Sequence, residues 1–505
     1  MVGVTDRVDS LDPAMSYGAG SWDLYSNIYQ GLLTVSTGSE EPVPDAAESC
    51  EFTDNAYQVY RCTLRSDLKF TSGRSVTPED VKFSIERILT MGERAAADRA
   101  DESIPEEEKF KFSGPYGLLS GVEAIRVDGQ DVVFELENPE VTFPFALAGG
   151  AGSIVDREEY ELDEATTDLA VGSGPYRLVE FEDADEESGR AGKAVLEPNT
   201  DYNGALQASD YPVTIRFYAD SASLQQAWEA REIHLNGGRM EPEDTQQVDR
   251  NDLDIRYSET TGQSIRALIS STASSSPLND EDVRRVMATL LDRDAIARDV
   301  RLHTVEAAYS LIPVGVTGHG TPYYDIYSSE NPDDAVDDLI AGGASLPIDI
   351  TIGYSGAVNQ AEAELVAQQL EADGVFEVEV ESFEVPGKII EAFGKGEVDA
   401  YLVGWRPDFA DPDTYTHALL TEGSILGHGK KNGEIDELIS QTRSEVDRGN
   451  TGELFREIHR LAAEDAVVIP IWQDRNFVIA DREITGLQHL RDAGGQFRLW
   501  ELQRL

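Results

Sequence analysis

A short apolar strand that ends in acidic side chains is the part of the sequence best suited to binding chemistry. The stretch 398–415 begins with the apolar run 400–403, continues through Gly404 and Trp405, and then turns at two prolines. This turn presents three carboxylates, those of Asp408, Asp411 and Asp413. Glycine and proline end strands abruptly. We therefore expect Trp405 and Asp408 at the mouth of the strand, where α/β proteins place ligands.

Two roles are open for these carboxylates. A carboxylate that faces a cationic ligand would make a charge-assisted hydrogen bond worth about 1.5–3 kcal/mol. Alternatively, all three acids only cap turns of their own backbone, and the residue types alone favour this structural role. Trp405 is likewise either a core side chain, as most tryptophans are, or a wall of the ligand site.

The sequence lacks the motifs of common catalytic and metal centres. It contains no His-Glu-x-x-His motif and no phosphate-binding Walker loop, and 353–357 departs from Gly-x-Ser-x-Gly at its last position. The seven histidines show no metal-ligand spacing. We therefore expect no enzyme, no cofactor and no metal site, while a receptor for a nickel or metallophore complex stays open.

The two cysteines, Cys50 and Cys62, flank a predicted hairpin whose turn falls near 53–56. Symmetric pairing about that turn sets them opposite each other, which permits a disulfide if the pair lies in register. A bridge would suit a protein outside the cytoplasm. Two free, half-buried thiols are the alternative. A metal site is disfavoured because no further cysteine and no nearby histidine completes a ligand set.

The elements that must position the acidic turn follow a regular order. The pattern predicts a strand at 347–353, a helix at 359–372, a strand at 376–383, a helix at 387–393 and the strand at 400–403. Strands that alternate with helices indicate parallel βαβ units. In the first half, Thr77 and Pro78 predict the start of a helix, whereas 93–109 lacks an apolar period and predicts an exposed excursion.

Size and charge limit the class of protein. A chain of 505 residues exceeds one hydrophobic core, so two or more domains are expected. The net charge is −55, and only nine of the 41 basic residues are lysine. Such a field repels nucleic acid and anionic membranes. An acidic, lysine-poor chain is best explained by a saline environment, because about 1 M salt shortens the Debye length to about 3 Å. No apolar run approaches the ~18–20 residues that span a bilayer.

Landmarks along nearly the whole chain match one family in order. They are 11–13 with 25–34, 44–64, 70–74 with 77–81, 172–176 with 199–202, 279–296, and the Gly-Trp-x-x-Asp turn that ends at Asp408. Together they closely resemble the solute-binding proteins of ABC importers, in the family of peptide and nickel receptors (family 5). Ordered landmarks are far more specific than one motif.

This resemblance implies an α/β protein with the two-lobed, periplasmic-binding-protein-like fold (type II). Mixed sheets with flanking helices are expected, with a larger first lobe. We assign residues 1–44, 171–256 and 473–505 to the core of lobe I, 45–170 to an extra subdomain of that lobe, and 257–472 to lobe II. The crossovers near Tyr257 and Trp472 are taken from the family.

The resemblance also assigns ligand binding to the acidic turn. In peptide-binding members, the aspartate of the Gly-Trp-x-x-Asp turn contacts the ligand's α-ammonium, so Asp408 is the leading candidate. Gly404, Trp405 and Arg406 accompany it, although Arg406 stands at a variable position of the motif. Asp411 and Asp413 are then structural.

A second segment is assigned in the first lobe. Tyr17, Gly18 and Ala19 follow the opening motif at the distance where family members line the cleft with backbone. Such a segment would offer main-chain hydrogen bonds to an extended peptide.

One departure from the family bears on the ligand. Dipeptide-binding relatives hold the ligand carboxylate with an arginine after the strand at 347–353, and the corresponding Tyr354, Ser355, Gly356 and Ala357 include no basic residue. We expect an oligopeptide receptor that delivers its ligand to ABC permease subunits. An oligosaccharide or metal-complex receptor, or a sensor with a signalling partner, is the alternative. A monomer at the cell surface, outside the cytoplasm and anchored through a removed leader or lipid, is expected.

Overall fold

The structure is a computed structural model that describes residues 1–505 except 39–40, 102, 106, 167–169, 185–189, 208–209, 329–330, 357–358, 373, 422–423, 425 and 493. It divides into unit 1, Met1–Thr260 with Asn476–Leu505, and unit 2, Thr261–Arg475. The chain passes between them inside two strands, β12 (Ile255–Ser270) and β17 (Val468–Asp481). The expected crossovers, near Tyr257 and Trp472, fall within these strands.

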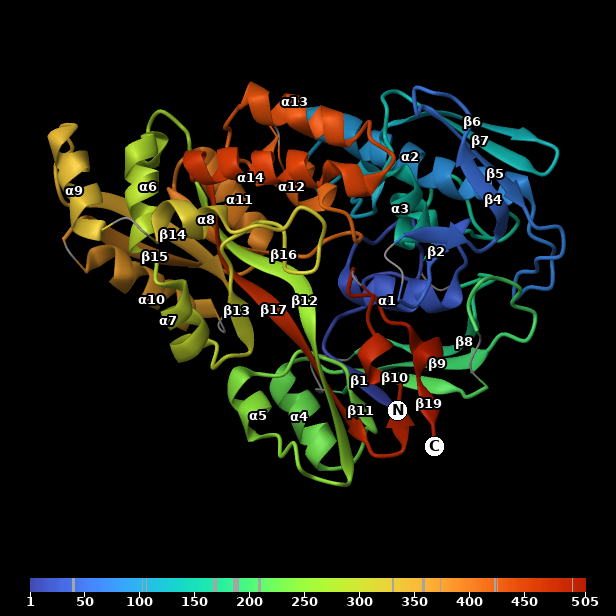
Figure 1. Cartoon of the computed structure of the whole chain (residues 1–505). Coiled ribbons are helices and arrows are strands. Elements are labelled where there is room, and N and C mark those ends of the chain that lie inside the picture. The colour runs from blue at the N-terminus through green and yellow to red at the C-terminus, as the bar shows by residue number, and fades with distance from the viewer. Residues whose placement is uncertain are drawn as a thin grey trace. The chain divides into compact units, whose positions relative to one another are not determined.

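Unit 1 contains helices α1 to α5, the strands β1 to β11, and a two-stranded C-terminal sheet of β18 and β19 (Figure 1). Its helices are α1 (Ala19–Ile28), α2 (Pro78–Ala100), α3 (Phe143–Ala148), α4 (Ser221–Glu229) and α5 (Pro242–Gln247). Its strands are β1 (Val2–Val4), β2 (Leu33–Val35), β3 (Pro42–Pro44), β4 (Ala47–Phe52), β5 (Val59–Leu64), β6 (Val122–Asp128), β7 (Asp131–Leu136), β8 (Tyr176–Glu182), β9 (Gly192–Pro198), β10 (Val213–Phe217), β11 (Leu235–Asn236), β18 (Ile484–Thr485) and β19 (Gln503–Arg504).

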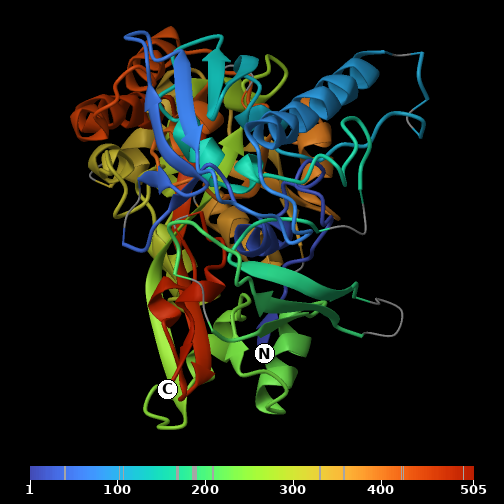
Figure 2. The ribbon, with the colours of Figure 1, turned by 90° about the vertical axis from the view of Figure 1, so that its right-hand side faces the viewer.

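Two sheets organise unit 1. The first has the order β17-β11-β1-β10-β9-β8, in which β1 is parallel to both of its neighbours and the outer pairs are antiparallel. The second is the antiparallel sheet β4-β5-β7-β6, with α2 packed on β6 and β7 (Figure 2). In it, the register of β4 and β5 sets Cys50 opposite Cys62, and their sulfur atoms are bonded.

Helix α2 begins where the sequence predicts and ends later. The Asp80 carboxylate accepts the Thr77 backbone N–H (2.8 Å), so the first turn is capped from within. The helix continues to Ala100. The segment 93–100, predicted as part of an exposed excursion, is exposed except at Ala95 and Asp98, but it continues the helix. This run is rich in alanine and charged helix formers, and helix propensity sustains it without an apolar stripe.

Unit 2 contains the remaining helices and strands. Its helices are α6 (Glu281–Leu290), α7 (Arg293–Ala295), α8 (Pro322–Tyr327), α9 (Pro332–Ala341), α10 (Gln360–Glu371), α11 (Pro386–Lys395), α12 (Asp413–Leu420), α13 (Gly433–Thr442) and α14 (Gly452–Asp465). Its strands, besides β12 and β17, are β13 (Val305–Ala307), β14 (Ile348–Ser355), β15 (Phe376–Phe383) and β16 (Ala400–Trp405).

The sheet of unit 2 has the order β15-β14-β16-β12-β17. Strand β14 is parallel to both β15 and β16, with α10 and α11 as the connecting helices, so the predicted parallel βαβ order is confirmed. Strand β12 runs antiparallel to β16, which makes the sheet mixed.

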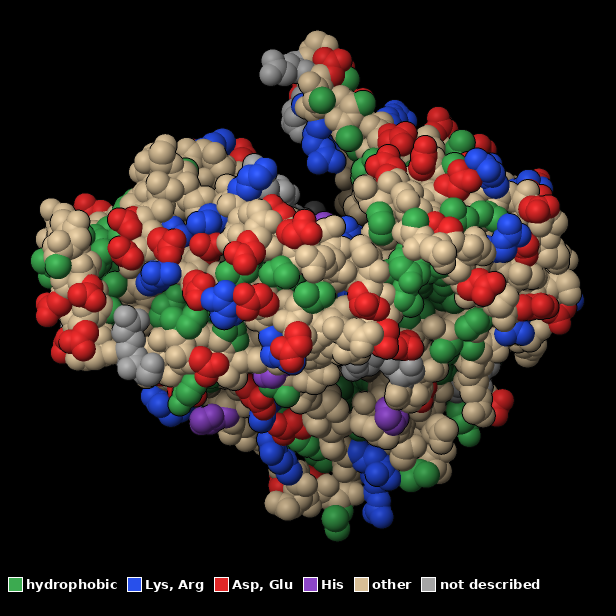
Figure 3. Space-filling model, turned by 45° about the horizontal axis from the view of Figure 1, so that its top comes forward, with side chains coloured by type: hydrophobic (Ala, Val, Ile, Leu, Met, Phe, Trp, Pro, Cys, Tyr) green, Lys and Arg blue, Asp and Glu red, His purple; other side chains and the backbone are tan. Residues whose placement is uncertain are grey.

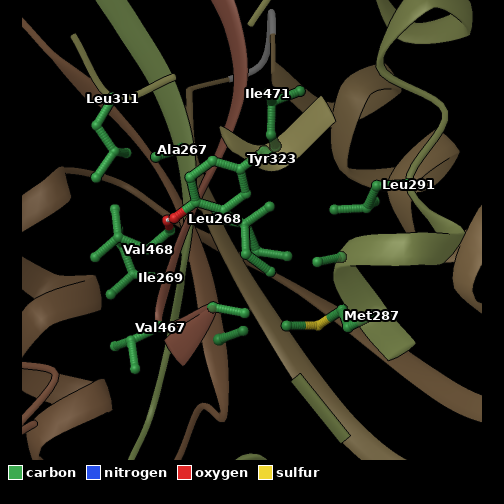
Figure 4. Packing of buried hydrophobic residues seen from close by; sticks show 14 of the residues in the cluster. Ala267, Leu268, Ile269, Met287, Leu291, Leu311, Tyr323, Val467, Val468 and Ile471 are labelled. Carbon is green, nitrogen blue, oxygen red and sulfur yellow. Dashed lines mark hydrogen bonds between the residues drawn. The ribbon is translucent and has the colours of Figure 1, made fainter. Parts of the chain in front are cut away.

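A single apolar core supports this sheet. Leu268 and Ile269 of β12 and Ile471 of β17 are fully buried and pack with Met287 of α6 and Tyr323 of α8 (Figure 4). The Tyr323 hydroxyl donates to the Val468 carbonyl (2.5 Å), so the one polar atom of this side chain is satisfied inside the core. This core therefore supports the sheet that contains β16, the strand before the acidic turn.

The negative charge is spread over both units. Unit 1 carries 25 basic and 57 acidic residues, a net charge of −32, and unit 2 carries 16 and 39, a net charge of −23. Acidic side chains are scattered over the face seen in Figure 3, with basic ones between them. In the part of the chain that the structure describes, no helix has the length and apolar character to cross a bilayer.

Candidate functional site

The acidic turn follows the C-terminal end of β16. The strand ends at Trp405, two residues later than predicted, because its antiparallel pairing with β12 continues through Arg266–Gly404 and Ile265–Trp405. Gly404 is exposed, and an added Cβ would meet no atom within 4 Å. The backbone at Gly404 is thus open on its side-chain face, at the end of a buried strand.

The next residues form the 404–408 turn: Gly404, Trp405, Arg406, Pro407 and Asp408. The Trp405, Arg406 and Asp408 side chains are half-buried. The Trp405 Nε1–H donates to the Thr414 carbonyl (2.9 Å), and the Asp408 backbone N–H donates to the Thr414 hydroxyl (3.2 Å). Both hydrogen bonds end on the first turn of α12, so the position of that helix sets the position of Trp405 and Asp408.

The other two acids of the loop are buried among arginines. Asp411 accepts two hydrogen bonds from Arg448, at 2.7 Å from Nε and 2.6 Å from Nη2. Asp413 lies 3.4 Å from the Arg443 Nε. Burial raises the pKa of the Asp411 and Asp413 carboxyls above the ordinary value, and Arg448 opposes that shift at both. These contacts give Asp411 and Asp413 the structural surroundings that were expected of them.

The predicted ligand segment of unit 1 lies at the start of α1. Tyr17 is 41% exposed and packs edge-on against Trp22, with ring centroids 5.1 Å apart. Gly18 is extended, and a Cβ there would lie 2.3 Å from the Asp9 Oδ2, so glycine suits the close approach. Ala19 is the first helical residue, so the extended backbone ends at Gly18.

This segment is held by hydrogen bonds on both sides. The Gly18 N–H donates to the Ser16 hydroxyl (3.1 Å), and the Trp22 Nε1–H donates to the Ser16 carbonyl (3.1 Å). Trp22 thereby packs on Tyr17 and fixes the residue before it. The 17–19 segment and the 404–408 turn belong to different units, and each is defined here by contacts inside its own unit.

Sequence reasoning missed a charged cluster beside the 404–408 turn. Glu362, 0% exposed, accepts from Arg266 Nε (2.6 Å), Arg301 Nε (2.8 Å) and the Trp472 Nε1–H (2.8 Å). Arg301 also donates to the Asn359 side chain (2.9 Å) before α10. Burial disfavours the charge of Glu362, but Arg266 and Arg301 hold the pKa of its carboxyl below the ordinary value.

These arginines bear on the basic residue that the sequence lacks after β14. Tyr354 and Ser355 end β14, Gly356 follows at a positive φ, and Ala357 lies outside the described residues. Arg301 comes from a loop more than 50 positions earlier. The fold thus brings a guanidinium group to this end of β14, and no local sequence signal could have identified it.

One cavity of unit 1 lies apart from the predicted ligand residues. An apolar cavity of about 270 Å³ in unit 1 is lined by residues of both chain ends, such as Val2, Ile484 and Leu502, and by Tyr211. None of the predicted ligand residues lines it. Within the described residues, no group of three or more His, Cys, Asp or Glu could hold a metal ion.

Comparison with known proteins gives one consistent answer. The family model for "Bacterial extracellular solute-binding proteins, family 5 Middle" matches residues 41–426. A probable D,D-dipeptide-binding periplasmic protein of Escherichia coli is 24% identical, over 96% of this chain and 90% of its own length. The periplasmic oligopeptide-binding protein of the same organism is 23% identical, over 92% and 85%.

Solved structures agree on the fold. The periplasmic binding protein DppA of Helicobacter pylori, in complex with the peptide STSA, superimposes with a TM-score of 0.78 at 21% identity, covering 100% of this chain and 97% of that one. Such structures are two-lobed periplasmic binding proteins, as predicted. The family model covers about three quarters of the sequence, and the chain therefore belongs to the bacterial extracellular solute-binding proteins, family 5.

Proposed function

We propose that this protein captures a peptide outside the cytoplasm and delivers it to the permease subunits of an ABC importer. As a member of its family it is a binding protein and not an enzyme. The observation that carries the proposal is the 404–408 turn at the C-terminal end of a buried strand, with Asp408 as the carboxylate for the peptide's α-ammonium. Relatives named for dipeptide and oligopeptide binding, similar over nearly the whole chain, support the choice of ligand.

Gly404, Trp405 and Arg406 contribute to this site beside Asp408, and Tyr17, Gly18 and Ala19 offer backbone groups to the peptide. The exposed Gly404 and the extended Gly18 support these roles. Arg301 supplies positive charge near the end of β14, where Tyr354 and Ser355 have none. Glu362 pairs with both Arg266 and Arg301, so this cluster has one more positive than negative charge, which favours a peptide carboxylate, within a unit whose net charge is −23.

Substitution of Asp408 by asparagine tests the proposal. The amide keeps the shape and loses the charge, so the affinity for unmodified peptides should fall about 10- to 150-fold, equivalent to ~1.5–3 kcal/mol. Calorimetry with the best binder from a defined library of di- to pentapeptides, free and N-acetylated, measures this. N-acetylated peptides should bind the wild type poorly, and Asp408→Asn should lose little further affinity for them.

Two results would count against the proposal. If wild type and Asp408→Asn bind free and acetylated peptides alike, Asp408 is only a turn residue. If the library does not bind at all, mass spectrometry of small molecules released by denaturing the purified protein identifies the ligand class. A sugar or a metal complex there would replace the peptide assignment.

We further propose that the protein works in a saline environment, as a monomer anchored to the membrane through an N-terminal leader or lipid. The net charge of −55 with nine lysines supports the saline environment, because unscreened repulsion opposes the folded state. The thermal midpoint should be lower below about 0.1 M potassium chloride than above about 1 M. A midpoint that does not depend on salt would refute the saline assignment, and light scattering tests the monomer.

A further inference from the structure

Two hydrogen bonds link the 404–408 turn to one residue of α12, Thr414. Trp405 and Asp408 both hydrogen-bond to Thr414, through its carbonyl and its hydroxyl. Thr414 is the second residue of α12, and its N–H donates to the Asp411 carbonyl (3.2 Å). Any group that fixes the start of α12 therefore also fixes Trp405 and Asp408.

The start of α12 is fixed by Asp411 and Arg448. The Asp411 Oδ1 accepts the Asp413 backbone N–H (2.9 Å), which closes a turn around Pro412. Arg448 binds both carboxylate oxygens and also donates to the Thr442 carbonyl (2.5 Å) at the end of α13. The Asp411 side chain is 2% exposed and that of Arg448 is 13% exposed. Because Arg448 also binds the end of α13, it holds Asp411 in a fixed position next to that helix.

The same local arrangement occurs beside the other predicted ligand segment. In unit 1, the Asp12 Oδ1 accepts the Ala14 N–H (3.0 Å) around Pro13, and Arg87 binds both Asp12 oxygens at 2.8 and 2.7 Å. Asp12 stands five residues before Tyr17. An Asp-Pro turn held by a bidentate arginine thus accompanies each predicted ligand segment.

A third buried aspartate–arginine pair serves as a comparison. Asp156 is 1% exposed and accepts the Glu158 N–H (3.0 Å) and the Arg74 Nε–H (2.7 Å). No proline follows Asp156, Arg74 reaches only one of its oxygens, and neither residue adjoins a predicted ligand segment.

We infer that Asp411 and Arg448 are positioning residues for ligand binding: they hold α12 so that Thr414 orients Trp405 and Asp408. Where it concerns affinity, this inference rests on the proposed function. Asp411 and Arg448 are not expected to contact the ligand. By this inference they determine the position of Asp408, which is expected to contact it. A group that must be held in place to act needs such support, because small displacements weaken charge-assisted hydrogen bonds.

A readout without ligand tests the positioning directly. The protein has five tryptophans, so the indole N–H signals of ¹⁵N-labelled protein can be assigned, with Trp405→Phe identifying the signal of Trp405. In Asp411→Asn the Trp405 signal should shift or broaden, while the other four keep their positions. Asp156→Asn, the matched control, should leave Trp405 unchanged. Arg448→Lys retains the charge but loses the bidentate geometry, and should give a smaller shift.

Peptide affinity supplies the second readout. Asp411→Asn should weaken binding of the best peptide of the library about tenfold, the equivalent of ~1.4 kcal/mol, and Arg448→Lys should weaken it less. Asp156→Asn should lower the thermal midpoint and leave the affinity unchanged. If Asp411→Asn does not fold, Arg448→Lys carries both measurements.

The outcomes separate this inference from the proposed function. An unchanged Trp405 signal in Asp411→Asn overturns the inference, whatever the ligand. An equal loss of affinity in Asp411→Asn and Asp156→Asn also overturns it, because the effect would then be general destabilisation. A moved Trp405 signal in a protein that binds no peptide supports the positioning role and refutes the peptide assignment alone.

Discussion

The two Asp-Pro turns lie in different units and differ in how much of the structure each one holds. In unit 1, the Asp12 and Arg87 side chains are 0% and 1% exposed. Arg87 also donates to the Glu161 and Glu164 carbonyls (2.5 and 3.0 Å), and the Thr166 N–H donates to Asp12 (3.0 Å). This pair therefore joins the N-terminal segment, α2 and the 161–166 loop.

The pair in unit 2 is more local. Asp411 and Arg448 are 37 positions apart, whereas Asp12 and Arg87 are 75 apart, and the Arg448 side chain reaches solvent. A buried charge that loses its partner costs more when water cannot reach it. The difference indicates that similar chemistry has two uses, as a junction of the fold in unit 1 and as a clamp on one turn in unit 2.

Removal of the arginine of each pair should give the largest difference in stability loss between the two units. Arg87→Met leaves the Asp12 carboxylate buried and unpaired, so unit 1 should lose about 3–5 kcal/mol of stability. Arg448→Met should cost unit 2 less. Denaturant unfolding can be followed by the indole signals of Trp22 in unit 1 and Trp472 in unit 2. Each signal then reports the stability of its own unit, which one unfolding transition of the whole chain would not. Equal losses in the two units would show that the two pairs are equivalent.

Removal of the disulfide should destabilise unit 1 while the Asp12–Arg87 pair stays intact. Replacement of Cys50 and Cys62 by serine should cost somewhat less than the ~3 kcal/mol expected for a 15-residue loop, because the cysteines are 12 positions apart. The loss should appear in the Trp22 signal and not in that of Trp472. Protein from its native source should show no alkylatable thiol by intact mass. Two reactive thiols without reductant would contradict the prediction.

Acid should act on unit 2 through a buried histidine. His459 is 1% exposed, and burial, with His319 as a smaller cause, lowers its pKa to about 3. Its unfolded pKa is about 6.5. The stability that neutral His459 provides is thus present above pH 6.5 and is lost as the pH falls toward 3, by about 1.4 kcal/mol per pH unit.

At pH 5, unit 2 should have lost about 2 kcal/mol through this residue. Denaturant unfolding of wild type and His459→Gln from pH 7 to 5 isolates the effect, since changes at the many carboxylates are common to both proteins. The difference in stability between the two should shrink as the pH falls. A constant difference would mean that His459 has the same pKa in the folded and the unfolded protein.

Some of these features could be predicted from the sequence and others could not. The difference depends on how far apart in the sequence the residues involved lie. The βαβ order depends on local periodicity, and the register of Cys50 with Cys62 depends on a hairpin with the short loop 53–58, so both could be predicted. The end of β16 was placed two residues early, because pairing with a distant strand decides where it stops. The ligand residues themselves stay predictions from family resemblance.

The arginine partners could not be predicted at all. Arg87, Arg301 and Arg448 reach their carboxylates from 37 to 75 positions away, and no pattern in the sequence marks them among 32 arginines. Asp411 could be assigned a structural role from its turn, but the partner that holds it requires the fold.

Unit 1 is built from two separate stretches of the chain, and the second of them is synthesised last. Its last segment is integral to it, since the Phe497 N–H donates to Asp23 (2.9 Å) and its carbonyl accepts from Ser26 and Asn27 in α1. At about 5–20 residues per second, the 245 residues after Thr260 take roughly 12–50 s to make. Unit 2, which is continuous, is complete before unit 1 has its final strands. The N-terminal half therefore leaves the ribosome without the partners it needs to finish folding.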